Sequence, residues 1–129
     1  MPDPGTARIL VVGANEALRD ILQTTLARAG HDVTEAADAG VGLAAYGANP
    51  ADVILLDVQA TGRMGAREFL QRLRGSSPDA RVVALVHRVS KGEADPLADA
   101  RDLGAAATIQ MPVSRDDLLR TVHEARAPD

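Results

Sequence analysis

Residues 50–57 read PADVILLD, and this stretch decides the fold class of the chain. The Asn49-Pro50 pair marks a turn, and the run that follows, 52–57, is polar only at its two ends. A short apolar run of this kind predicts a strand that is buried on both faces, as the strands of parallel sheets are. We expect strands at four further short runs: 8–12 (RILVV), 32–35, 81–86 (RVVALV) and 106–109.

The segments between these runs carry helix signals. Asn15, Asp38 and Ser114 are expected to cap the first, second and last helices, and Pro96 to begin the fourth. Alternation of strand and helix predicts a parallel sheet covered on both faces, with a binding crevice beyond the carboxyl ends of the strands. Apolar stripes are expected at Leu18, Ile21, Leu22, Thr25 and Leu26 of the first helix, Phe69, Leu70 and Leu73 of the third, and Leu118, Leu119, Val122 and Ala125 of the last.

The composition excludes several classes of protein. The 129 residues suffice for one domain, and we expect it at 7–126, with a disordered N-terminus at 1–6 and a tail at 127–129. The absence of cysteine excludes a disulfide scaffold or thiolate metal site, and the net charge of −4 argues against direct nucleic-acid binding. No apolar run approaches the roughly 20 residues of a membrane span and no signal peptide is visible, so we expect a cytoplasmic protein without membrane contact.

Several motifs occur together in one order. They are ILVV at 9–12, EALRDIL at 16–22, AGHDVTEAADA at 29–39, PADVILLD at 50–57, the glycines Gly62 and Gly65, RVVALV at 81–86, DLGA at 102–105, and Pro112 before a capped helix. In this order the chain resembles the receiver domain of bacterial two-component response regulators, the CheY-like family, over about residues 8–125. The resemblance implies a doubly wound α/β fold of the flavodoxin type, a five-stranded parallel sheet with strand order 2-1-3-4-5.

The chemistry of that family depends on a phosphoacceptor aspartate at the end of the third strand, a role that the resemblance assigns to Asp57. The acidic pair that holds Mg²⁺ in the family falls on Gly13 and Ala14. The hydroxyl residue that ends the fourth strand, the aromatic switch residue of the fifth strand and the lysine of the last crossover fall on Val86, Thr108 and Met111, respectively.

These replacements predict a degenerate receiver, or pseudo-receiver, in which Asp57 is vestigial. Mg²⁺ is usually held by carboxylates, and Asp57 supplies one, which a backbone carbonyl near Gln59 would not complete. Losing one group that stabilises developing charge costs about 2.7–4 kcal/mol of barrier. We therefore expect no magnesium ion or other cofactor and no catalytic residue. We also expect no phosphorylation-driven switch, because Val86 cannot donate a hydrogen bond and Thr108 has no ring.

Other polar residues near the crevice have structural interpretations. Asn15 is expected to cap its helix and Glu16 to be a favourable acid in the first turn, rather than to rebuild the acidic pair. Arg63 and Arg88 are expected to be solvated, although either could bind an anion or reach Asp57. The three histidines have no second ligand at a useful spacing and predict no metal site: His31, His87 and His123. The turn after 8–12 lacks the glycines of a dinucleotide-binding G-x-G-x-x-G motif.

We therefore expect a phosphorylation-independent protein–protein interaction module of bacterial signal transduction. Its partner would be a signalling protein or an output domain, or a second copy of the chain in a homodimer. The resemblance places the interaction face on the fourth helix, fifth strand and fifth helix, at Leu97, Arg101, Ala105, Thr108, Leu118 and Val122. Two alternatives stay open: phosphorylation of Asp57 by a histidine kinase in a phosphorelay, and binding of a small molecule in the vacated pocket.

Overall fold

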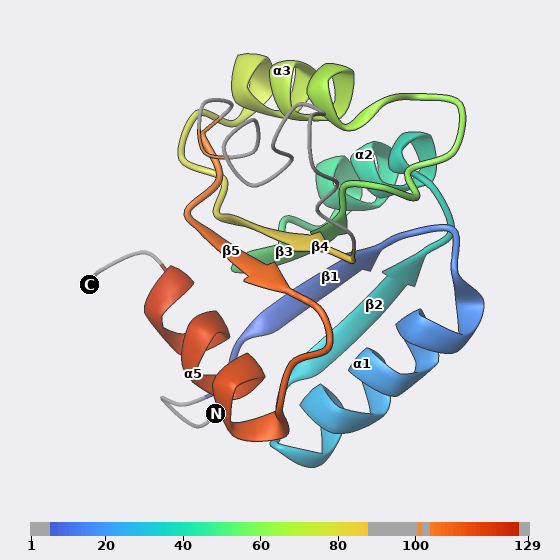
Figure 1. Cartoon of the computed structure of the whole chain (residues 1–129). Coiled ribbons are helices and arrows are strands. Elements are labelled where there is room, and N and C mark those ends of the chain that lie inside the picture. Colours follow the sequence, from blue (N-terminus) through green and yellow to red (C-terminus); the bar gives the residue numbers. More distant parts are fainter. Residues whose placement is uncertain (1–5, 88–100, 102–103, 127–129) are drawn as a thin grey trace.

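The computed structural model describes residues 6–87, 101 and 104–126 (Figure 1). Its centre is a five-stranded parallel sheet with the order β2-β1-β3-β4-β5, which confirms the expected fold class. The strands are β1 (Arg8–Val12), β2 (Asp32–Ala36), β3 (Val53–Asp57), β4 (Val82–Val86) and β5 (Ala107–Gln110). The described helices are α1 (Glu16–Arg28), α2 (Ala39–Ala48), α3 (Ala66–Ser76) and α5 (Arg115–Ala125).

Each face of the sheet has its own apolar core, as the apolar runs predict. Helices α1 and α5 cover one face, and α2 and α3 cover the other (Figure 1). All residues of β3 and β4 are buried, because these strands are sandwiched between the two cores. The carboxyl end of β3 is therefore enclosed by neighbouring strands and by the loops beyond them.

The expected helix caps are confirmed. Asn15 Oδ1 accepts a hydrogen bond from the Leu18 amide at 3.1 Å, and Asp38 Oδ1 accepts one from the Val41 amide at 2.8 Å. Ser114 caps α5 in the same way, through the Asp117 amide. These bonds fix where α1, α2 and α5 begin, and so fix the turns at the carboxyl ends of the strands. The helix expected to begin at Pro96 lies outside the described residues, apart from Arg101, which is helical and exposed.

Two expectations about α1 and α5 are wrong. Ile21 was expected in the buried stripe of α1, but it is 63% exposed and lies outside the core that Leu22 and Leu26 join. Leu118 and Val122 were expected on an interaction face, but they are 3% and 0% exposed. Both belong to the core between α5 and the sheet, since the apolar stripe of an amphipathic helix packs inward. The outer surface of α5 must be formed by other residues.

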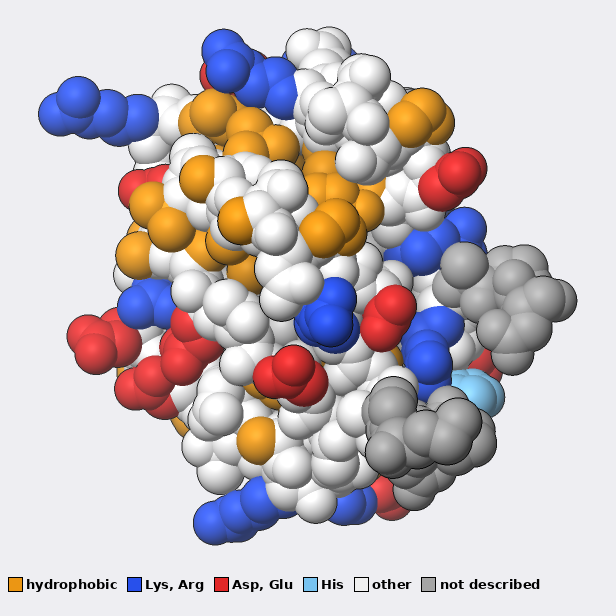
Figure 2. All heavy atoms as spheres, turned by 180° about the vertical axis from the view of Figure 1, so that it is seen from behind, with side chains coloured by type: hydrophobic (Ala, Val, Ile, Leu, Met, Phe, Trp, Pro, Cys, Tyr) orange, Lys and Arg blue, Asp and Glu red, His pale blue; other side chains and the backbone are white. Residues whose placement is uncertain are grey.

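The outer face of α2 is unusually apolar. This helix, AGVGLAAYGA, contains no charged residue, and its Val41 is 50% exposed. Figure 2, which shows the molecule from behind, has hydrophobic side chains gathered in the region of α2. Within the described residues, no helix is long and apolar enough to cross a membrane.

Candidate functional site

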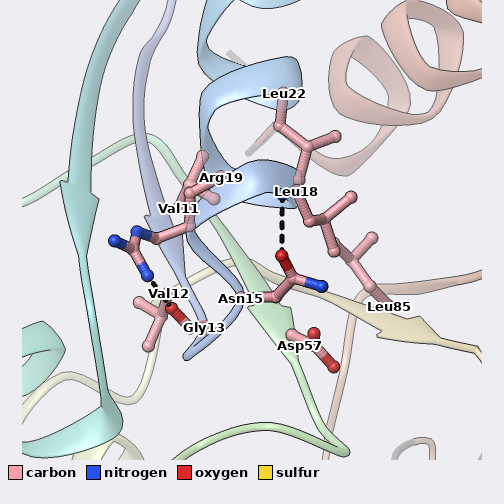
Figure 3. A pocket seen from close by; sticks show the side chains of 9 residues that line it. All are labelled: Val11, Val12, Gly13, Asn15, Leu18, Arg19, Leu22, Asp57 and Leu85. Carbon is pink, nitrogen blue, oxygen red and sulfur yellow. Dashed lines mark hydrogen bonds between the residues drawn. The ribbon is translucent and has the colours of Figure 1, made fainter.

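Asp57 is the last residue of β3 and lies at the carboxyl edge of the sheet, 2% exposed. The turn that joins β1 to α1 packs directly against it (Figure 3). A Cβ atom added at Gly13 would lie 3.0 Å from the Cβ of Asp57, which is tighter than ordinary packing. Glycine at position 13 therefore allows the backbone of this turn to approach the aspartate closely.

Both carboxylate oxygens of Asp57 have partners within the chain. The backbone amide of Gln59 donates to Oδ1 at 3.2 Å, and the Nε2 atom of His87 lies 3.0 Å from Oδ2. An ionised carboxylate can only accept, so His87 carries a hydrogen on Nε2 when it bonds ionised Asp57. Burying a carboxylate is costly unless it is paired, and these two contacts supply the pairing.

A second contact fixes His87 in place. Its backbone amide donates to the Oε1 atom of Gln59 at 2.6 Å. The sequence interpretation put His87 near the crevice but missed its bond to Asp57 and the contribution of Gln59. The sequence alone gives no signal for this contact, because the contact depends on strand register: Leu85 is in register with Asp57 in the neighbouring strand, and His87 lies two residues beyond Leu85. Residues two apart along a strand point to the same face, so His87 follows Leu85 toward Asp57.

Arg19 is another residue of this region that the sequence interpretation did not single out. It extends from α1 to the opposite side of the turn, and its Nη1 atom donates to the carbonyl oxygen of Gly13 at 2.6 Å (Figure 3). Its Nε atom lies 3.4 Å from Glu35 Oε1. Arg19 thus braces the turn from the side away from Asp57.

A small hollow lies beside Asp57, and among the described residues it is lined by Gly13, Asn15 and Arg19 as well. It is too small to admit a water molecule. No group of three or more His, Asp or Glu side chains in the described parts of the chain could hold a metal ion. An open groove of about 440 Å³ lies beside the hollow, lined by Asn15, Ala17, Leu18, Ile21, His87, Met111 and Pro112. The arrangement pairs a buried carboxylate with a histidine and leaves that histidine at the edge of a groove.

The other polar residues considered from the sequence lie apart from Asp57 or serve structural roles. Asn15 caps α1, and Glu16 is exposed in the first turn. Arg63 is exposed, whereas Arg88 lies outside the described residues. His123 is exposed on α5, far along the chain from the carboxyl edge of β3.

His31 has a structural partner at the opposite edge of the sheet. The Ala7 amide, just before β1, donates to His31 Nδ1 at 2.9 Å. Burial, and to a lesser degree the positive charge of Arg126, lowers the pKa of His31 below 6.5. The imidazole therefore remains neutral and able to accept this hydrogen bond down to a lower pH than a free histidine would.

Comparison with protein families identifies the family to which this fold belongs. The description of the matching family is "Response regulator receiver domain", and the match covers residues 9–123. The chain belongs to the response regulator receiver domain family. It is therefore a receiver domain of two-component signalling. A comparison with curated proteins found none that matches the chain.

Solved receiver structures agree with this assignment. CheY4 of Vibrio cholerae is 26% identical, with a TM-score of 0.82, and the match covers 93% of this chain and 98% of that one. A CheY-like receiver domain protein from Methanospirillum hungatei is 28% identical, with a TM-score of 0.80 and coverage of 91% and 90%. NtrX of Brucella abortus is 27% identical, with a TM-score of 0.84, and there the match covers 93% of this chain but 27% of NtrX. The receiver domain is thus a part of a longer chain in NtrX.

The family resemblance assigns roles to four further residues: Ala14, Val86, Thr108 and Met111. Ala14 is exposed, and its backbone amide bonds the carbonyl oxygen of Ala60 at 2.8 Å. Val86 is fully buried at the end of β4. Thr108 is half-buried in β5, and Met111, half-buried before a cis bond to Pro112, packs against the core under α5.

Proposed function

We propose that this receiver domain is a protein–protein interaction module of two-component signalling that works without phosphorylation of Asp57. One observation carries the proposal: the oxygens of Asp57 are bonded to Gln59 and His87 of the same chain, while Gly13 packs where the family has a carboxylate. Both carboxylate oxygens therefore already have hydrogen-bond partners within the chain, and the carboxylate faces the backbone of Gly13 rather than a second acid.

The chemistry of phosphoryl transfer supports the proposal. Transfer needs a cation and hydrogen-bond donors at the oxygens of the moving phosphoryl group. Gly13 and Ala14 offer no side-chain ligand, Val86 offers no donor, and Met111 offers no positive charge. We propose that magnesium does not bind here in the absence of a partner, that no cofactor replaces it, and that the protein is not an enzyme.

The docking surface in this proposal lies on β5, on α5 and on the described residues just before β5. Thr108 and Ala105 are half-buried and Arg101 is exposed, so these three members of the expected face remain available. Leu97 lies outside the described residues. The outer side of α5 presents exposed Arg120 and His123 beside Glu124 in place of the buried Leu118 and Val122. We propose that a signalling protein, an output domain or a second copy docks on this polar surface.

A direct test compares the protein and its Asp57→Asn variant by amide NMR, with Mg²⁺ and beryllofluoride added together. Beryllofluoride imitates a phosphoryl group on a carboxylate. We expect no saturable, Mg²⁺-dependent change in the amides at the ends of β3 and β4 of the unmodified protein. A saturable change that disappears in the variant would overturn the proposal.

One observation favours a second candidate function, phosphorylation of Asp57 in a phosphorelay. Asp57 ends β3, where the resemblance puts the phosphoacceptor. The same NMR experiment, repeated with acetyl phosphate in place of beryllofluoride, tests whether the chain by itself accepts a phosphoryl group. A phosphoryl-dependent change that is absent in Asp57→Asn would support this candidate, and no change would count against it.

A further inference from the structure

We propose that Asp57, Gln59 and His87 form an internal latch that holds the ends of β3 and β4 together in one arrangement. The proposal rests on the proposed function, because it names what fixes the domain in one state without a phosphoryl group. The latch consists of these three residues and the hydrogen bonds among them.

The latch is a closed set of contacts between two adjacent strand ends. The Gln59 amide donates to Asp57 Oδ1, His87 Nε2 meets Asp57 Oδ2, and the His87 amide donates to Gln59 Oε1. Each residue contacts both of the others. His87 is consequently held by its ring and by its backbone.

The residues of the latch differ in burial, so Asp57 depends on the contact more than His87 does. Asp57 is 2% exposed, whereas the side chain of His87 is 34% exposed and Gln59 lies at the surface. The buried carboxylate has little access to water, so losing the histidine leaves Oδ2 under-satisfied, while the histidine itself can be hydrated. The closed arrangement is therefore favoured mainly by the need of Asp57 for a partner.

His87 follows the last residue of β4, so its bond to Asp57 attaches the end of β4 to the end of β3. In the family a hydroxyl group on the last residue of the fourth strand is drawn toward the phosphorylated aspartate, and Val86 at that position cannot respond. The next residue, His87, reaches the aspartate directly. The end of β4 is thus attached to Asp57 by this chain's own side chain, where the family needs a phosphoryl group to attach it.

The test is hydrogen exchange of the two amides in the latch, measured by NMR on the whole protein without metal or phosphodonor. In His87→Ala the Gln59 amide and the amide of position 87 should exchange about tenfold faster, as expected for the loss of one hydrogen bond to a charged group. In Gln59→Ala the His87 amide should accelerate similarly. His87→Gln, whose amide nitrogen can reach toward Asp57, should restore part of the protection.

His123→Ala is the matched control, because His123 is an exposed histidine outside the latch. It should leave both amides within twofold of the unmodified protein. Core amides of β1 and β3 serve as references, so that a local opening is separated from a global loss of stability. Unchanged exchange in His87→Ala, or acceleration equal to that of the core amides, would overturn the latch.

This outcome is separable from that of the phosphoryl experiment. If the unmodified protein responds to beryllofluoride and the latch variants exchange faster as expected, phosphorylation independence is refuted and the latch is supported. If exchange is equally slow in His87→Ala and in the unmodified protein, the latch is refuted and the proposed function is unaffected.

Discussion

At the residue level, no neighbour of Asp57 supplies a second carboxylate, and the contacts of Asp57 come instead from a glycine backbone and a histidine ring. Gly13 brings backbone to within packing distance of the carboxylate, and His87 supplies a donor from the next strand. The oxygens of this aspartate take part in an internal hydrogen-bond network. Asp57 therefore has a structural role, because its hydrogen bonds connect the ends of β3 and β4.

Introducing an acid at position 13 should lower the free energy of unfolding, and magnesium should reduce this loss. Gly13→Asp places a second carboxylate against buried Asp57, and like charges at short range oppose each other. We expect it to lower the free energy of unfolding on the order of 1–3 kcal/mol more than Gly13→Ala, which adds the same Cβ without charge. Urea unfolding with and without Mg²⁺ checks this.

Added Mg²⁺ should recover part of the loss in Gly13→Asp and none in Gly13→Ala, because only the former has two carboxylates to share a cation. Equal losses in the two variants, insensitive to Mg²⁺, would contradict this account of position 13.

At the scale of the element, the helices position the site through their first turns. The caps at Asn15, Asp38 and Ser114 determine where each chain segment turns away from the carboxyl edge of the sheet. Helix α2 is the exception in composition, since it has no charged residue and leaves Val41 half exposed. Helix α5 shows the opposite pattern, with an apolar stripe inward and charged residues outward.

The cap of α5 gives a prediction at this scale. Ser114→Ala removes the acceptor for the Asp117 amide and should lower the free energy of unfolding by about 1 kcal/mol. Ser114→Asp keeps an acceptor and adds a charge that is favourable at a helix N-terminus, so it should stay close to the unmodified protein. Urea midpoints measured at one pH compare the three proteins; equal destabilisation by both variants would argue that the hydroxyl acts otherwise.

At the scale of the whole molecule, the two faces of the sheet are stabilised by separate cores, and the start of β1 is held by His31. This histidine joins the turn after α1 to the beginning of β1. Because it accepts from the Ala7 amide through Nδ1, only an imidazole without a proton on Nδ1 can make the bond.

Stability should therefore fall as the solution becomes acidic around the ordinary pKa of histidine. Burial lowers the pKa of His31 in the folded chain below 6.5, so the unfolded chain binds more protons in that range. The contribution of His31 is fully present above pH 6.5 and is lost as the pH falls below it toward the folded pKa. His31→Asn, which offers an oxygen acceptor and does not titrate, should show a weaker pH dependence in urea unfolding. An identical pH dependence in both proteins would exclude His31 as a source.

The strands, the helix caps and the buried run that ends at Asp57 could all be predicted from local patterns, because apolar runs and capping residues act over a few neighbours along the chain. The strand order came from the family resemblance, and the structure confirms it. The resemblance also assigns family roles to Gly13, Ala14, Val86, Thr108 and Met111, and these assignments stay predictions.

Which groups meet was settled by folding. The apolar stripe of α5 predicts that Leu118 and Val122 face inward, but the core that they join comes from the way the helix lies on the sheet. The bond from His87 to Asp57 joins residues 30 positions apart. No local pattern contains this bond, since a polar residue after a strand has several available neighbours. The choice among those neighbours is made by strand register and by packing, and these exist only once the chain has folded.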